Sequence, residues 1–248
     1  MNRFRNRQRR GSGGSSGFSA GAVGAGTLKM WLRADTVVLN GADVLTLTDK
    51  SGLGNSPTQA AGPNQPLWVA SAQNSKPCVR YTAANSDCHV KGATDLLGTG
   101  PYTVFLVIQD RTIIADSCYF GLDDTLGGAG VFFGLRNTSP NRNANHTNVA
   151  THADDAMQST APEIWCMQYT AGAGPTFQLN GTTVALANSS TSGLLATGGT
   201  NGAITVGGRT GGTDFSDLDF YEAIVYSSNL SAADRGRATA YLRGRYNL

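Results

Sequence analysis

The sequence predicts an all-β sandwich of the jelly-roll type, with two antiparallel sheets and one short C-terminal helix. Glycine supplies 32 of the 248 residues and charged residues make up only 15%, a composition typical of short strands joined by turns. Roughly twelve short apolar or alternating segments follow one another, separated by turn residues, which is the spacing of a sandwich. Only the residues after Ser231 have a helical pattern.

Two internal segments carry the strongest strand signal. Residues 102–109, Y-T-V-F-L-V-I-Q, are apolar on both faces, which predicts a central strand that is covered on both sides. Residues 176–186 hold Asn180-Gly181 between two alternating runs, and this pair favours a hairpin turn because both residues accept positive φ. The polar stretch 137–160 predicts asparagine-rich loops around an edge strand near Asn148.

The C-terminal stretch 215–248 predicts a closing strand followed by a helix. The strand is dense in aromatic and β-branched residues. Ser231 is the expected N-cap, with its hydroxyl accepting the amide of Asp234. Arg243 and Arg245 place cations in the last turn, where they favour the helix dipole.

Residues 1–26 form a separate N-terminal arm that is rich in arginine and then in glycine and serine. Such a composition predicts a flexible segment. It serves either as an anchor on an acidic surface, another protein or nucleic acid, or as a solubilising tail. The domain then covers residues 27–248. The arm arginines are Arg3, Arg5, Arg7, Arg9 and Arg10.

Other classes of protein are disfavoured. No apolar run has the length of a membrane span, and the charged N-terminus is not followed by the apolar segment of a secretory signal. We therefore expect no membrane insertion and no export by the usual route. The four cysteines lack metal-site spacing and are expected as buried free thiols, with a Cys78–Cys88 bridge as the alternative. They are Cys78, Cys88, Cys118 and Cys166.

Several motifs resemble laminin-G-like, concanavalin A-like lectin/glucanase jelly-roll domains. They are L-K-M-W-L-R-A-D, D-K-S-G-L-G-N, Q-A-A-G-P-N-Q-P-L-W-V, N-S-K-P-C-V-R-Y, F-Q-L-N-G-T-T-V and I-T-V-G-G-R, followed by E-A-I-V-Y-S-S-N-L-S-A-A-D-R and Y-L-R-G-R-Y-N-L. The resemblance covers about residues 27–248. It implies two antiparallel sheets, adjacent first and last strands, and a binding or adhesion role that is often directed at sugars.

A lone domain of this kind with a basic arm is similar to bacteriophage virion proteins. In those proteins a sandwich decorates a head or tail, and an arm plugs it into the particle. The resemblance implies a virion location, a partner such as the major capsid protein, and a homo-oligomer or high-copy assembly. Cell-surface glycans and nucleic acid are further partners that it suggests.

One acidic motif is a candidate for catalysis. Asp217, Asp219 and Glu222 are similar to the Glu-x-Asp-x-x-Glu of laminarinase-type glycosidases, although the first acid here is Asp. In a regular strand Glu222 points away from the other two acids, so a catalytic arrangement would need a bulge. We expect no catalysis, with Glu222 tied to loop amides or to an arginine because an unpaired buried carboxylate is costly.

A few residues are candidates for binding a metal ion or a sugar. No cofactor is expected, although Asp214, Asp217 and Asp219 could supply oxygen ligands for calcium. The three histidines lack the spacing of a triad or a zinc site and are expected in loops or facing solvent. Sugar binding needs aromatic platforms beside amides, and most aromatic residues lie in cores. The candidates for such a platform are Trp68, Tyr119, Tyr169 and Asn145.

These features together predict a non-enzymatic virion protein that decorates the capsid and is held by its N-terminal arm. One alternative is a free carbohydrate-binding lectin module. A second alternative is a laminarinase-like glycoside hydrolase.

Overall fold

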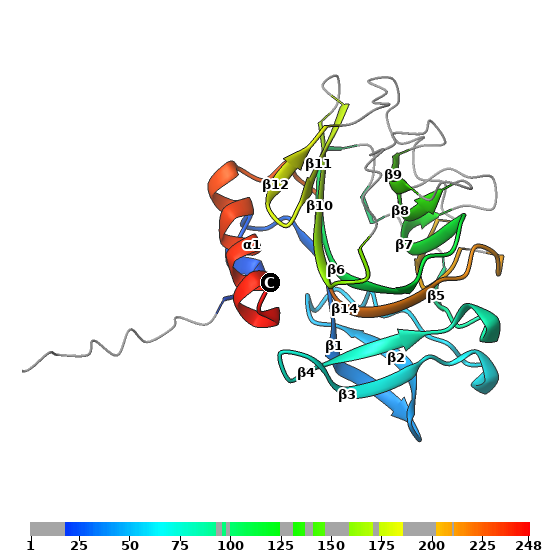
Figure 1. Ribbon diagram of the computed structural model, residues 1–248. Coiled ribbons are helices and arrows are strands. Elements are labelled where there is room, and N and C mark those ends of the chain that lie inside the picture. Colours follow the sequence, from blue (N-terminus) through cyan, green and yellow to red (C-terminus); the bar gives the residue numbers. More distant parts are fainter. Residues whose placement is uncertain are drawn as a thin grey trace, which may run out of the picture.

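The computed structural model describes residues 18–92, 96–97, 100–124, 131–136, 141–146, 159–170, 174–185, 202–209 and 211–248. Two antiparallel sheets face each other, and the helix α1 (Ala232–Tyr246) covers the outer face of the larger sheet (Figure 1). The predicted all-β sandwich with one C-terminal helix is therefore confirmed. Within the described chain no helix combines the length and the apolar character needed to cross a bilayer.

The larger sheet has nine strands and the smaller has five. In spatial order the larger sheet consists of β1 (Leu28–Asn40), β2 (Asp43–Asp49), β3 (Leu67–Gln73), β4 (Lys76–Tyr81), β14 (Asp217–Tyr226), β6 (Tyr102–Thr112), β10 (Glu163–Thr170), β11 (Gly174–Leu179) and β12 (Thr182–Val184). The smaller sheet consists of β5 (His89–Lys91), β13 (Ala203–Val206), β7 (Ser117–Asp124), β8 (Val131–Arg136) and β9 (Asn141–His146). Three short 3-10 turns complete the described elements: η1 (Ala20–Ala22), η2 (Gly62–Asn64) and η3 (Ala83–Asn85). The edge strand expected near Asn148 is β9, and Asn148 itself lies outside the described residues.

The strand β14 is the centre of the larger sheet. One of its edges pairs with β6 along its whole length, and the other edge is divided between two strands. The first half of that edge pairs with β4, from Leu218 to Phe220, and the second half pairs with β1, from Glu222 to Tyr226. The first and last strands are thus adjacent, as the resemblance implied.

A register shift against β6 occurs in β14 between Phe220 and Glu222. Phe220 and Ala223 pack in the core between the sheets, whereas Tyr221 and Ile224 pack on the outer face. Two consecutive residues, Tyr221 and Glu222, therefore face the same side of the sheet. A bulge inserts one residue into a strand and so reverses the alternation beyond it.

The molecule has two hydrophobic cores. The larger lies between the sheets, and the smaller lies between the nine-stranded sheet and α1. The strand β6 contributes alternate residues to both, Val104 and Leu106 to the first and Phe105 and Val107 to the second. This confirms the prediction that residues 102–109 form a central strand covered on both faces.

The N-terminal boundary of the folded domain differs from the expected one. Residues 18–23, which we call the N-terminal strap, pack beside α1 and were predicted to belong to a flexible arm. Phe18 stacks on Tyr241 with ring centroids 3.9 Å apart, and the backbone oxygen of Ala20 accepts a hydrogen bond of 3.1 Å from the Tyr226 hydroxyl. Ala20 and Val23 are buried. The folded part therefore begins by Phe18, while Arg3, Arg5, Arg7, Arg9 and Arg10 lie outside the described residues.

One histidine prediction is also corrected. His89 was expected in a loop or facing solvent, but its side chain is fully buried between the Tyr81 hydroxyl at 2.7 Å and the Val44 carbonyl at 3.0 Å. These two hydrogen bonds satisfy both ring nitrogens, which makes burial of an imidazole tolerable. The four cysteines are buried and free, so the alternative of a bridge between Cys78 and Cys88 is not realised.

Candidate functional site

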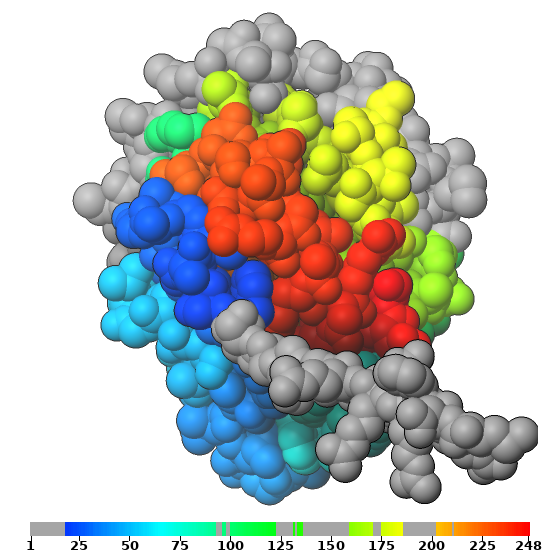
Figure 2. All heavy atoms as spheres, turned by 90° about the vertical axis from the view of Figure 1, so that its left-hand side faces the viewer, coloured from blue at the N-terminus to red at the C-terminus, as the bar shows by residue number. Residues whose placement is uncertain are grey.

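A polar groove runs along one side of α1, between the helix and the strands β10, β11 and β12. Figure 2 shows this face, with the β11–β12 hairpin in yellow beside the orange and red helix. Two adjoining hollows form the groove, with volumes of about 360 Å³ and about 540 Å³. They share Gln178, Ala232 and Arg235. Neither hollow is lined by an aromatic, acidic or histidine side chain among the described residues.

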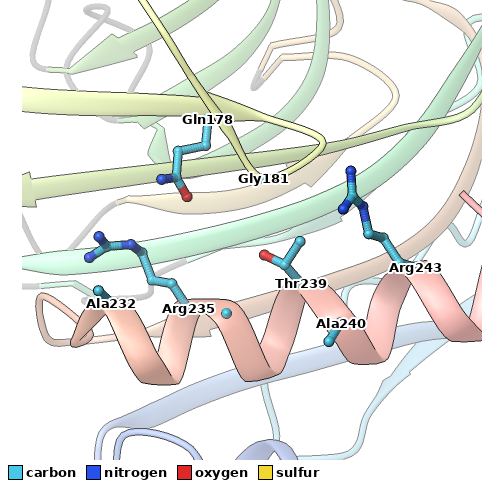
Figure 3. Close-up of a pocket in the computed structure, with 8 residues that line it drawn as sticks. Gln178, Gly181, Ala232, Arg235, Thr239, Ala240 and Arg243 are labelled. Atoms are coloured by element: carbon cyan, nitrogen blue, oxygen red, sulfur yellow. The ribbon is translucent and has the colours of Figure 1, made fainter.

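The helix side of the groove starts at a well-formed cap. The Ser231 hydroxyl accepts a hydrogen bond of 3.1 Å from the amide of Asp234, as predicted. Arg235, Thr239 and Arg243 then follow at intervals of four residues, so they lie along one side of the helix. In Figure 3 their side chains project from α1 toward the hairpin, and Gln178 faces them from β11.

The opposite wall is set by the hairpin turn that the sequence predicted. Asn180 and Gly181 have φ values of 50° and 79° and connect β11 with β12, as expected for an Asn-Gly pair. A side chain at position 181 would bring its Cβ to 3.1 Å from the Thr239 methyl group. Glycine thus allows the turn to approach the helix closely at this end of the groove.

Hydrogen bonds hold the two walls together. The Arg243 guanidinium donates to the Asn180 carbonyl at 2.7 Å, which ties the helix to the hairpin turn. The Arg235 guanidinium donates to the Leu230 carbonyl at 2.8 Å, and that same carbonyl accepts from the Gln168 side chain at 2.9 Å. The groove is therefore formed before any ligand arrives, which lowers the entropic cost of binding.

The predicted calcium ligands do not line the groove, and arginines neutralise their negative charges. The Arg80 guanidinium donates bidentate hydrogen bonds of 2.8 Å and 2.7 Å to the Asp219 carboxylate. Arg111 lies 3.7 Å from Asp217 and 3.5 Å from Asp219. Asp214 instead lies 3.6 Å from Arg209. Among the described residues no group of three or more His, Cys, Asp or Glu is placed to hold a metal ion, so the three aspartates are not brought together as a cation site.

Glu222 lies beneath α1 and is fully buried. Its carboxylate accepts hydrogen bonds from the Trp31 indole at 2.6 Å, the Tyr246 hydroxyl at 2.8 Å and the Tyr241 hydroxyl at 3.0 Å. The Arg245 guanidinium lies 3.3 Å away. The predicted arginine partner is thus confirmed, whereas ring hydroxyls and an indole take the place of the expected loop amides. Burial raises the pKa of Glu222, and these donors partly offset that effect.

The bulge required for the glycosidase motif is present, since Glu222 faces the same side of β14 as Asp219. The acids are nevertheless covered. Asp219 is only 3% exposed and Glu222 is 0% exposed, so neither carboxylate of this pair is open to a polysaccharide in this structure.

The candidate sugar platforms are not gathered at one surface. Tyr119 and Tyr169 are 1% and 2% exposed and belong to the core between the sheets, which corrects their assignment as contact residues. Trp68 is half-buried, and its indole donates to the Ala34 carbonyl at 2.9 Å. The side chain of Asn145 lies outside the described residues, although its backbone belongs to β9. Both tyrosines occupy inward-facing positions of their strands, which the residue type alone does not reveal.

The groove residues were missed in the sequence because their signal is weak. Arg243 was interpreted only through the helix dipole, and Gln178 only as part of an alternating strand. The available signal was the spacing of Arg235, Thr239 and Arg243 along one helix side, which becomes meaningful only when a second wall is known.

No protein-family model matches the sequence, and no curated protein matches it. Solved structures do match. A sialidase of Trypanosoma rangeli in complex with sialic acid superposes with a TM-score of 0.61 at 13% identity, over 90% of this chain and 34% of that chain. The chain has a lectin-like β-sandwich fold.

Two further matches are arabinofuranosidases. A GH54 α-L-arabinofuranosidase gives a TM-score of 0.60 at 15% identity over 89% of this chain and 60% of that chain. An arabinofuranosidase complexed with arabinofuranosyl-α-1,2-xylobiose gives a TM-score of 0.59 at 16% identity, over 89% of this chain and 59% of that chain. The chain thus spans about a third of the sialidase and less than two thirds of the arabinofuranosidases. At these identities the likeness shows the fold alone.

Proposed function

We propose that this chain is a non-enzymatic carbohydrate-binding module whose site is the groove between α1 and β10–β12. The observation that carries the proposal is the chemistry of the groove lining. Thr170, Thr176, Gln178, Thr183 and Asn229 supply amides and hydroxyls along one preformed hollow. Such groups pair with sugar hydroxyls, which both donate and accept hydrogen bonds, so we expect this groove to hold a sugar by polar contacts and not on the aromatic platform expected from the sequence.

Two facts favour binding over hydrolysis. Glycoside hydrolysis commonly requires a pair of carboxyl groups on either side of the scissile bond, and the described residues that line the groove include no Asp or Glu. The acids that resemble a glycosidase motif, Asp219 and Glu222, are buried. The matched structures include sialidase and arabinofuranosidase complexes with sugars, which agrees with a sugar-directed role on this fold and supports it by analogy only.

The test is glycan binding by the full chain and by matched groove variants. We expect binding on a glycan panel to weaken by about fivefold or more in Gln178→Ala/Thr183→Ala, because each substitution removes a hydrogen-bonding group. Thr182→Ala is the control, since Thr182 lies in the same short strand, is exposed and does not line the groove. A panel on which the parent protein binds no glycan would overturn the proposal.

Catalysis has its own test. The parent protein should release no sugars from β-glucans, and Glu222→Gln should lower only the stability, because removing one partner of a buried charged network costs about 3 kcal/mol. Polysaccharide cleavage that is present in the parent and lost in a folded Glu222→Gln protein would establish the glycosidase alternative.

We further propose that the module is a virion structural protein that decorates a particle and is attached through its N-terminal arm. The supporting observation is the strap: Phe18 is stacked on Tyr241 of α1, so the folded domain includes Phe18, and the arginine-rich residues precede it in the sequence. The proposed partner is another virion protein such as the major capsid protein, with many copies of this chain on each particle. Binding of nucleic acid by the arginines is the alternative, and deletion of the arm, described in the Discussion, tests the attachment.

A further inference from the structure

Two arginines of the groove differ from the other arginines of the chain. Arg235 and Arg243 both line the groove, and neither forms an ion pair with a described acid. Every other arginine whose side chain is described has a carboxylate partner. These paired arginines are Arg33, Arg80, Arg111, Arg209, Arg237 and Arg245.

The two guanidinium groups have donors to spare. Each has five N–H groups in a fixed planar arrangement, and the backbone carbonyls of Leu230 and Asn180 account for only part of them. These two hydrogen bonds also fix the directions of the side chains, and Figure 3 shows Arg235 and Arg243 both projecting from α1 on the groove side. A positioned guanidinium loses little further entropy when it binds an anion, which makes it an effective carboxylate or sulfate receptor.

The surroundings add to the positive potential. The groove begins at Ala232 in the first turn of α1, where the helix dipole is positive. The acid of that turn, Asp234, is paired with Arg237 and accepts from Ser231, and it does not line the groove. No described carboxylate therefore neutralises the two groove arginines.

We propose that the groove binds acidic oligosaccharides, with Arg235 and Arg243 each pairing with a carboxylate or sulfate group of the glycan. The inference rests on the proposed function and names its ligand class. Arg235 and Arg243 are eight residues apart, so their backbones are separated by about 12 Å along the helix. The acid groups must accordingly lie on different sugar units, while Thr239 and Gln178 between them contact neutral hydroxyls.

Gly236 offers a test that leaves both arginines in place. It lines the groove, and a Cβ built on it meets no atom within 4 Å. Gly236→Glu places a negative charge between the arginines, and Gly236→Gln places an uncharged side chain of the same size there. Gly244→Glu adds the same charge at an exposed helix position that also has open space but does not line the groove.

The probes are a uronic-acid oligosaccharide, a sulfated oligosaccharide, a neutral oligosaccharide of equal length, and a short single-stranded oligonucleotide. We expect the parent to prefer the acidic glycans, and Gly236→Glu to weaken their binding about tenfold or more, since charged hydrogen bonds contribute about 1.5–3 kcal/mol each. Gly236→Gln and Gly244→Glu should change binding by less than about threefold. Arg243→Gln should repeat the loss, with Arg237→Gln as its control.

The outcomes separate the two proposals. Binding of neutral glycans that is sensitive to Gln178→Ala/Thr183→Ala, without a preference for acidic ones, would keep the proposed function and overturn this inference. Acidic binding that survives both Gly236→Glu and Arg243→Gln would also overturn it. Equal binding of the oligonucleotide would show a general polyanion site and reject glycan recognition. Absence of all binding would overturn both proposals.

Discussion

At the scale of single residues, Asp87 and His89 have opposite effects on stability in the same pH range. Asp87 is 2% exposed; one carboxylate oxygen accepts from the Thr82 amide at 2.8 Å, and the other has no hydrogen-bond partner. Burial is the main cause that raises its pKa to about 6. Burial also lowers the pKa of His89 to about 4, despite its hydrogen bond to the Val44 carbonyl.

The direction of each pKa shift determines at which pH the residue stabilises the folded protein. An Asp has an unfolded pKa of about 3.9, so the contribution of Asp87 is present below that pH and is lost as the pH rises through about 6. A His has an unfolded pKa of about 6.5, so the contribution of His89 is present above that value and is lost as the pH falls toward about 4. Between these limits the two effects largely cancel.

We therefore expect the Asp87→Asn variant to show the pH dependence of stability that His89 causes. Its free energy of unfolding should increase between pH 4 and pH 6.5 by up to about 3 kcal/mol more than that of the parent, because the opposing carboxylate is gone. Urea unfolding at several pH values measures this difference. His89→Gln is the counterpart, and its stability should decrease over the same range. Identical pH profiles for the parent and both variants would contradict the assignment.

At the scale of elements, α1 is held by its tertiary contacts more than by its own sequence. Gly236 and Gly244 both lie in the helix interior, and at each the Cβ position is open. Interior glycine costs about 0.5–1 kcal/mol relative to alanine. The helix is secured by Ala238 and Leu242, which are buried in the smaller core, and by the hydroxyls of Tyr241 and Tyr246, which donate to the buried Glu222.

We expect Gly236→Ala and Gly244→Ala each to raise the free energy of unfolding by about 0.5–1 kcal/mol, which corresponds to a Tm increase of a few degrees. Gly181→Ala is the opposite control. Its φ of 79° is unfavourable for alanine, and the new Cβ would lie 3.1 Å from Thr239, so its Tm should fall. Thermal unfolding followed by circular dichroism distinguishes these variants, and a lower Tm for both helix variants would be inconsistent with open space at those positions.

At the scale of the whole molecule, the N-terminal strap and the C-terminal helix meet on the outer face of the larger sheet. The strap and α1 lie beside each other there, blue and red in Figure 2. Phe18, Ala20 and Val23 share a core with residues of β14 and of α1, such as Tyr226 and Leu242. The strap is therefore part of the folded domain.

We expect removal of residues 1–17 to leave the unfolding midpoint unchanged and to abolish attachment to the particle. Removal of residues 1–23 should also abolish attachment, but it should lower stability by about 2–5 kcal/mol because buried side chains of the strap are lost. Unfolding curves and incorporation into particles measure the two effects separately. Unchanged incorporation after removal of residues 1–17 would refute the anchor.

Local patterns in the sequence determined the β-sandwich, the two-faced strand at residues 102–109, the Asn180-Gly181 turn and the cap at Ser231. Each of these depends on neighbouring residues, through alternation, turn propensity or a hydrogen bond within one turn.

Only the tertiary structure decided the bulge at Glu222, the burial of Tyr119 and Tyr169, the start of packing at Phe18, and the groove. Which arginines meet a carboxylate was decided at the same level, because ion pairs such as Arg80–Asp219 join residues distant in the chain. Burial and charge compensation are properties of the assembled neighbourhood, and that is why Arg235 and Arg243 stand out only once the fold is known.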